Sequence, residues 1–256
     1  MRKNLTFIIL IGVVIALAAA AAVFAWRKYS SAVCADIVVH VAKNSPEFIA
    51  KERLVAQIRS FLASADSSGK KDAGRQILLS EINTGNVEKE LKKATSVARV
   101  EVFRKVYATG NELKGRLVVN VAFRQPLFRV AGTRDFYVDA DGVPVYEVHL
   151  YPAHVPVVTG AVDEKYAARM LPLMKFLSSD KFWRAQIQQL NVTANGDILM
   201  APLAGDHIIE FGPPDRFREK FRNLTALYEQ GFREVGWDRY RKVSVKYRNQ
   251  VVCTKK

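Results

Sequence analysis

The residue types that most often carry chemistry do not converge in this sequence. None of the four histidines, His40, His149, His154 and His207, forms the helical i,i+4 pair around a glutamate that is typical of a zinc-binding helix. The run Asp139-Ala140-Asp141-Gly142 contains part of a calcium-loop pattern but lacks the earlier and later ligands, so it predicts a hairpin turn. We therefore expect no metal site and no cofactor.

Catalytic nucleophiles and phosphate-binding loops also lack their signatures. Ser68-Gly69-Lys70 is without the preceding glycine and strand that frame a phosphate loop, and the sequence contains no Gly-X-Ser-X-Gly run. Cys34 and Cys253 stand outside any catalytic pattern; they could pair in an oxidising compartment, but two separate, buried thiols are the expected state. We expect a protein that is not an enzyme and has no small-molecule substrate.

One segment predicts a membrane anchor. Residues 5–26 are uncharged and lie between Arg2-Lys3 and Arg27-Lys28, and a helix of that length crosses the ~30 Å hydrocarbon core. A cleaved signal peptide is the alternative, but the apolar run exceeds the ~7–15 residues typical of one. We expect an uncleaved single span after a cytoplasmic tail at 1–4. Equal basic flanks leave the orientation open, and a long downstream domain can translocate regardless of its charge.

Composition and net charge limit the class of protein and the kind of partner that the rest of the chain can represent. A content of 49% hydrophobic and 25% charged residues is typical of a globular protein. The formal net charge of +14 predicts an anionic neighbour, which could be lipid head groups or an acidic protein. No nucleic-acid-binding motif accompanies the charge, so we expect no nucleic acid.

The soluble part predicts an α+β fold in two domains, at 33–125 and 126–256. The first has the order strand, helix, helix, strand, strand, with a hairpin turn at Thr109-Gly110-Asn111. Ser45-Pro46-Glu47 and Asn86 are typical helix starts. The expected bounds are 35–42, 45–62, 87–98, 97–107 and 116–123.

The second domain is predicted to be β-rich with flanking helices. Asp163 caps a helix that Pro172 interrupts, and Pro213-Pro214-Asp215 starts another that Gly231 ends. The inward stripe of the latter is Phe217, Phe221, Leu224 and Tyr228. The expected strands are 136–139, 143–148, 155–159, 185–192, 197–200, 207–211 and 242–252.

Several stretches together resemble the FtsQ/DivIB family of bacterial cell-division proteins. A strand ending in Arg124-Gln125-Pro126 resembles the junction between the two domains of that family, and residues 136–142 resemble the hairpin that opens its second domain. The other similar stretches are 86–91, 100–103, 117–121, 155–160 and 243–252. Two positions depart from the family pattern, because Ser244 stands where many members carry Asp and Lys246 where many carry Arg.

The resemblance implies a fold and a function. It implies a POTRA-like domain after the anchor and then a β-domain, in a single-pass protein of the bacterial inner membrane with its large domains periplasmic. It also implies a non-enzymatic divisome scaffold that binds bitopic proteins of the FtsB and FtsL type and helps control septal cell-wall synthesis. The alternatives are an anchored POTRA-type component of protein assembly or secretion, and an anchored enzyme of unknown class.

The last predicted strand supplies the candidate partner site. Val243, Val245, Tyr247 and Val251 share one of its faces. If this strand is an open sheet edge, its free backbone groups can pair with a partner strand, and its basic side chains favour an acidic segment. The alternative is a central strand that is already paired on both sides. The candidate partner-binding residues are Lys242, Ser244, Lys246, Tyr247, Arg248, Gln250 and Val252.

Overall fold

The computed structural model describes residues 2–43, 45–46, 48–65, 77–110, 112–146 and 153–256. The chain forms two compact units. Unit 1 comprises Met1–Ser45 and Ile49–Phe123, and unit 2 comprises Pro46–Phe48 and Arg124–Lys256. Ser68-Gly69-Lys70, His149 and the end of the strand predicted at 143–148 lie outside the described residues.

The first element of unit 1 is a long apolar helix, α1 (Arg2–Ser30). Its part from Ile11 to Ser30 is long and apolar enough to cross a membrane, and none of that stretch is buried within the protein. Trp26 and Tyr29 near its end are exposed, and Arg27 and Lys28 stand in its last turn.

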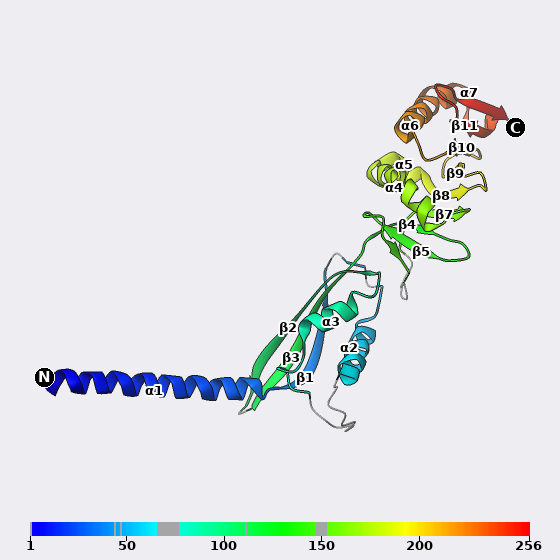
Figure 1. Ribbon diagram of the computed structural model, residues 1–256. Helices are drawn as coiled ribbons and strands as arrows, with labels where there is room; N and C mark the ends of the chain where they lie inside the picture. The colour runs from blue at the N-terminus through cyan, green and yellow to red at the C-terminus, as the bar shows by residue number, and fades with distance from the viewer. Residues whose placement is uncertain (1, 44, 47, 66–76, 111, 147–152) are drawn as a thin grey trace. The chain divides into compact units, whose positions relative to one another are not determined.

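Unit 1 continues as a three-stranded sheet with helices on one face (Figure 1). The strand order is β1-β3-β2, in which β1 (Val33–Val41) runs parallel to β3 (Glu112–Phe123), and β2 (Val97–Thr109) pairs with β3 as an antiparallel hairpin. Helices α2 (Lys51–Ala65) and α3 (Thr84–Leu91) cover the aliphatic face of the sheet. Alternation along β3 explains this, because Leu117, Val119 and Val121 are all buried on that face.

Both helix starts predicted in unit 1 are wrong. The Ser45 hydroxyl does not cap a helix; it accepts a hydrogen bond from Phe123 N (2.6 Å), and α2 begins at Lys51. Asn83, rather than Asn86, caps α3, since its side chain accepts from Asn86 N. The predicted end of α3 at residue 98 is also wrong, because the helix stops at Leu91 and β2 begins at Val97.

Unit 2 contains a nine-stranded mixed sheet in the order β12-β11-β10-β9-β8-β7-β4-β5-β6. The pairings of β4 with β7, β7 with β8 and β10 with β11 are parallel; the others are antiparallel. The strands are β4 (Pro126–Val130), β5 (Phe136–Asp139), β6 (Pro144–Val145), β7 (Val157–Gly160), β8 (Ile187–Val192), β9 (Ile198–Pro202), β10 (Ile208–Gly212), β11 (Tyr240–Ser244) and β12 (Val252–Lys255).

One buried carboxylate organises the first strands of unit 2. Asp139 accepts hydrogen bonds from Asp141 N (2.9 Å) and Val143 N (2.8 Å), which fold the predicted Asp-Gly turn. The same carboxylate accepts a hydrogen bond from the Arg124 guanidinium at 2.7 Å. Two stretches that the sequence presents separately therefore meet in one ion pair.

Two of the helix predictions in unit 2 need correction. Pro172 does not interrupt α4 (Glu164–Ser179), which Asp163 caps as predicted. Residues 185–186 are helical rather than extended, because Asp180 caps a further helix, α5 (Lys181–Gln186).

The third helical segment of unit 2 is longer than predicted. It is a continuous rod of α6 (Phe217–Ala226), a π-helical turn (Leu227–Gly231) and α7 (Phe232–Val235), followed by a short 3-10 turn (Trp237–Arg239). Gly231 is therefore not the residue that ends the helix, since its φ is −68° and the chain turns at Gly236, with φ +84°.

These helices bury an aromatic core against the sheet. Phe221 lies 4.8 Å from Trp183 and 5.1 Å from Phe211, measured between ring centroids, and Tyr228 stacks on Phe232. Two polar side chains lie in the same core, His207 and Lys220, each 1% exposed.

Candidate functional site

The predicted partner-binding residues do not form one strand. Residues 240–244 form β11, residues 247–250 form a turn, and β12 begins at Val252, so the prediction of a continuous strand at 242–252 is wrong. The chain reverses because Asn249 adopts a left-handed conformation with φ +56°. As a result, β11 is an internal strand, and β12 stands at the end of the strand order among the described residues.

The candidate residues on β11 differ in accessibility. Lys242 is exposed, and its ammonium lies 3.5 Å from the Glu210 carboxylate on β10. Ser244 is 2% exposed, and its hydroxyl has no hydrogen-bond partner among the described residues. Ser244 is thus enclosed by the fold, whereas Lys242 faces solvent.

The turn after β11 brings together four of the predicted residues. Lys246 forms an ion pair with Asp197, which raises the pKa of the lysine ammonium. Tyr247, with 55% of its surface exposed, is followed by Arg248 and Gln250, which are also exposed. The turn therefore presents an aromatic, a cationic and an amide side chain to solvent.

Hydrogen bonds hold this turn against the start of α6. The Arg216 guanidinium donates to Lys246 O at 3.3 Å, and Asn249 N donates to the Glu219 carboxylate at 3.4 Å. The turn is thus placed by side chains of another element, and the start of β12 follows from it.

One side of the β12 backbone is hydrogen-bonded to β11, and the other side has no neighbouring strand among the described residues. Lys256 N donates to Arg239 O at 3.2 Å, toward β11. Because successive residues of a strand direct their backbone groups to opposite sides, Thr254 also faces β11. The N–H and C=O groups of Cys253 and Lys255 consequently face the open edge.

Side chains alternate on β12 as well. The Cys253 side chain packs against the core cluster, and burial raises the pKa of its thiol. Val252 is 44% exposed. One face of β12 therefore packs against the core through Cys253, and the other face exposes the apolar side chain of Val252.

A groove of about 520 Å³ borders the residues that lead into β12. Asn249 and Val251 line one of its walls, and the helical rod lines the other. The residues of the second wall are small or polar except for one leucine: Asn223, Ala226, Leu227, Gln230, Gly231 and Glu234.

Sequence reasoning missed the helical wall of this groove. Its members recur at spacings of three, four and seven residues from Asn223, the period of one helix face. The sequence prediction assigned only the apolar stripe of this helix and assigned binding to no residue on the face that lines the groove. The signal that could have identified it is the pair Ala226 and Gly231, which leave space where longer side chains would fill it.

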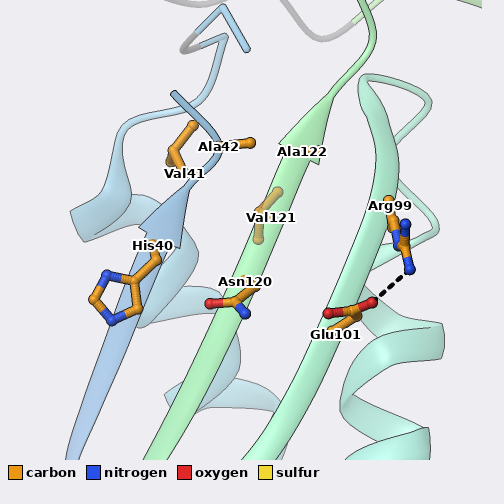
Figure 2. Close-up of a pocket in the computed structure, with 8 residues that line it drawn as sticks. All are labelled: His40, Val41, Ala42, Arg99, Glu101, Asn120, Val121 and Ala122. Atoms are coloured by element: carbon orange, nitrogen blue, oxygen red, sulfur yellow. Dashed lines mark ion pairs between the residues drawn. The ribbon is translucent and has the colours of Figure 1, made fainter. Parts of the chain in front are cut away.

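A second cavity, of about 470 Å³, lies on the uncovered face of the unit 1 sheet (Figure 2). His40, Asn120 and Glu101 stand in one row across β1, β3 and β2, as the strand register requires. Arg99 pairs with Glu101 at 2.8 Å, and both side chains are well exposed. An exposed row of this kind is typical of a solvated sheet face.

Other chemistry has little support in the part of the chain that the structure describes. No group of three His, Cys, Asp or Glu side chains lies close enough there to hold a metal ion. Cys34 and Cys253 are free, half-buried thiols. Three features of unit 2 are accessible on its surface among the described residues: the edge of β12, an exposed turn and a groove.

Comparison with protein families places the second half of the chain. Residues 125–254, half of the chain, match the family model described as FtsQ/DivIB, C-terminal related. No curated protein matches the chain. The matched range begins within the Arg124-Gln125-Pro126 run and ends in β12, so it includes residues of all nine strands of the unit 2 sheet.

Proposed function

Because the chain belongs to the FtsQ/DivIB family of cell-division proteins, we propose that it is a membrane-anchored divisome scaffold of the bacterial inner membrane. In this proposal it binds bitopic division proteins of the FtsB and FtsL type and helps control septal cell-wall synthesis, without catalysing a reaction. Unit 1 acts as the POTRA-like domain next to the membrane, and unit 2 as the periplasmic β-domain that carries the partner site.

The anchor is supported by α1. One described helix is long and apolar enough to span a bilayer, and it ends with Trp26, Arg27 and Lys28, a combination typical of a membrane interface. A single span leaves both units on one side of the membrane. A bitopic partner anchored in the same membrane would then meet unit 2 at a high local concentration.

The observation that carries the proposal is the open edge of β12. An extended partner segment can add there as a tenth strand and receive main-chain hydrogen bonds from Cys253 and Lys255. Edge strands that are not covered invite such pairing, and lysines beside them oppose indiscriminate self-association. Lys255 supplies that protection on β12 itself, and Lys256 directly follows the strand.

Exposed cationic side chains near the edge indicate the charge of the partner segment. Lys242, Arg248 and Lys255 are exposed near the edge, so the segment that binds should be acidic. Tyr247 and Val252 offer apolar surface beside these charges, and exposed aromatic residues are frequent anchors at interfaces. The buried Ser244 is left without a direct contact in this proposal.

The groove beside the edge can receive the part of the partner that adjoins the added strand. Its helical wall presents amide groups of Asn223 and Gln230, which can pair with the backbone of a peptide. Ala226 and Gly231 let that backbone approach closely. Recognition would then combine strand addition with a short segment lying along the helical rod.

A proline substitution tests strand addition. In full-length protein, Lys255→Pro removes a backbone donor that faces the open edge, and proline is tolerated on such a side of an edge strand. We expect at least about a tenfold loss of affinity for an FtsB-type partner, measured by titration in detergent.

The matched control is Lys255→Ala, which removes the same charge but keeps the N–H. We expect it to bind within a few-fold of the parent protein. If the proline variant melts like the parent and binds as tightly as the alanine variant, strand addition at β12 is contradicted.

A further inference from the structure

The β2–β3 hairpin lies at the same end of the unit 1 sheet as α1. Strand β1 starts three residues after the end of α1 and runs parallel to β3, with Val33 opposite Lys114. The hairpin continues past that pair through Thr109 and Glu112, which stand opposite each other at its tip. Its tip therefore points back along the sheet toward the membrane helix.

Hydrogen bonds tie this end of unit 1 to the last turn of α1. Ser80 Oγ donates to Ser30 O at 3.0 Å, and Leu79 N donates to Ala32 O at 2.8 Å. The Arg104 guanidinium on β2 donates to Ser80 O at 3.3 Å. The sheet end is thus held next to the position where α1 would leave the bilayer.

Cationic side chains gather at this end. On the uncovered sheet face the strand register sets Lys105 directly opposite Arg116, and Lys114 opposite Tyr107. Like charges directly opposite each other destabilise a strand pair unless counter-charges offset them. Arg116 has one such partner, the Asp36 carboxylate at 3.1 Å.

Among the described residues at this end of the unit, cations outnumber carboxylates. We name the group the juxtamembrane basic surface. Its members are Arg27, Lys28, Arg104, Lys105, Lys114 and Arg116, and the carboxylates at the same end of the unit are Asp36, Glu81 and Glu112. The carboxylates named here are too few to neutralise all of these cations.

We infer that the juxtamembrane basic surface binds the anionic head groups of the membrane that α1 spans. Each lysine or arginine close to an anionic lipid surface strengthens association about fivefold, and the effect decays within a Debye length of ~8 Å. Tyr29 and Tyr107 add aromatic side chains suited to the interface. Head-group binding would fix unit 1 against the bilayer at a defined height and so limit its rotation about the anchor.

The inference rests on the membrane span within the proposed function. The experiment uses full-length protein in lipid nanodiscs, of phosphatidylcholine alone or with about 30% phosphatidylglycerol. Amide hydrogen exchange of residues 104–110 and 112–116 is followed by mass spectrometry. We expect exchange in the anionic discs to slow by about fivefold or more, and the difference to disappear in high salt.

Charge variants locate the effect. Lys105→Glu with Lys114→Glu should abolish the slowing, and Lys105→Gln with Lys114→Gln should reduce it. The control is Lys43→Glu with Lys92→Glu, which makes the same charge change at exposed positions on the opposite end of the unit and should leave the slowing intact. Unchanged protection of Leu117 and Val119 amides would confirm that each variant is folded.

The outcomes separate the two claims. Protein that does not co-elute with the discs contradicts both the membrane span and head-group binding. Protein that co-elutes but exchanges equally in both lipids overturns head-group binding alone, and so does slowing that persists in the Lys105→Glu, Lys114→Glu variant.

Discussion

The two units bury different kinds of core. Among the described residues, the core of unit 1 is almost entirely aliphatic, with Leu54, Ile58 and Leu117 as typical members and Phe123 as its buried aromatic. Unit 2 instead buries a network of aromatic rings and encloses Asp139, His207, Lys220 and Ser244. An aliphatic core depends on volume alone, whereas the core of unit 2 also depends on polar contacts and on protonation. The units should therefore respond differently to mutation and to pH.

The largest expected difference comes from truncating the aromatic network. Phe221→Ala removes a ring that contacts Phe176, Trp183 and Phe211, and should lower the free energy of unfolding of unit 2 by about 3–5 kcal/mol. Urea unfolding of the full-length protein, followed by tryptophan fluorescence, measures this, because Trp183 and Trp237 both lie in unit 2.

The matched change in unit 1 is Leu117→Ala, also at a fully buried position. We expect a cost of about 2–5 kcal/mol, detected by hydrogen exchange in unit 1, with little change in the fluorescence transition. Coincident loss of both transitions in either variant would show that the two cores unfold as one, and the comparison would fail.

A smaller effect should follow from removing a buried ion pair. Asp139→Ala removes the carboxylate that accepts from the Arg124 guanidinium and from two backbone N–H groups, at a cost of about 2–3 kcal/mol to unit 2. Arg99→Ala in unit 1 breaks an exposed pair and should cost less than about 1 kcal/mol. Thermal melts of the two variants check the contrast, which equal shifts would refute.

The smallest expected effect is a pH dependence confined to unit 2. His207 accepts or donates one hydrogen bond with the Tyr228 hydroxyl at 2.8 Å, and burial lowers its pKa despite the nearby Asp206 carboxylate. Below its ordinary pKa of about 6.5 the unfolded state binds a proton that the folded state resists, so acidification destabilises unit 2.

The slope is at most about 1.4 kcal/mol per pH unit, between the lowered pKa and 6.5. Urea midpoints between pH 5 and 8 measure it. His207→Phe keeps a ring in the aromatic cluster and should flatten the profile. A profile that stays as steep in the variant would assign the titration to another group.

Strands and buried helix faces can be predicted from the sequence where a pattern of neighbouring residues alone determines them. Alternation of Val and Leu locates β3, and the spacing of Phe221, Leu224 and Tyr228 locates the buried face of α6 and of the π-helical turn after it. Asp163 caps α4 as predicted because its side chain needs only the amide three residues on. These features depend on contacts that are local in the chain.

Predictions fail where a contact with a residue far away in the sequence determines the local structure. Ser45 looks like a helix cap, but its hydroxyl bonds to Phe123, 78 positions away. The strand predicted at 242–252 breaks because Arg216 and Glu219 hold the intervening turn. For the candidate site, the sequence suggests basic and aromatic residues between 242 and 252, and their part in binding stays a prediction. The identity of the edge strand cannot be predicted from the sequence, because it depends on which strand β10 pairs with.

The buried Lys220 makes the opening of unit 2 measurable by chemistry. Its ammonium donates to Pro213 O (2.7 Å) and Asp215 (2.9 Å) and lies over the Phe211 ring, while desolvation lowers its pKa. A lowered pKa would make the amine a good nucleophile if reagents could reach it, but the side chain is 2% exposed. An amine-directed acylating reagent should therefore label the surface lysines quickly and Lys220 only during openings of the core. The acylation rate of Lys220 would therefore report how often the core of unit 2 opens in the intact, full-length protein.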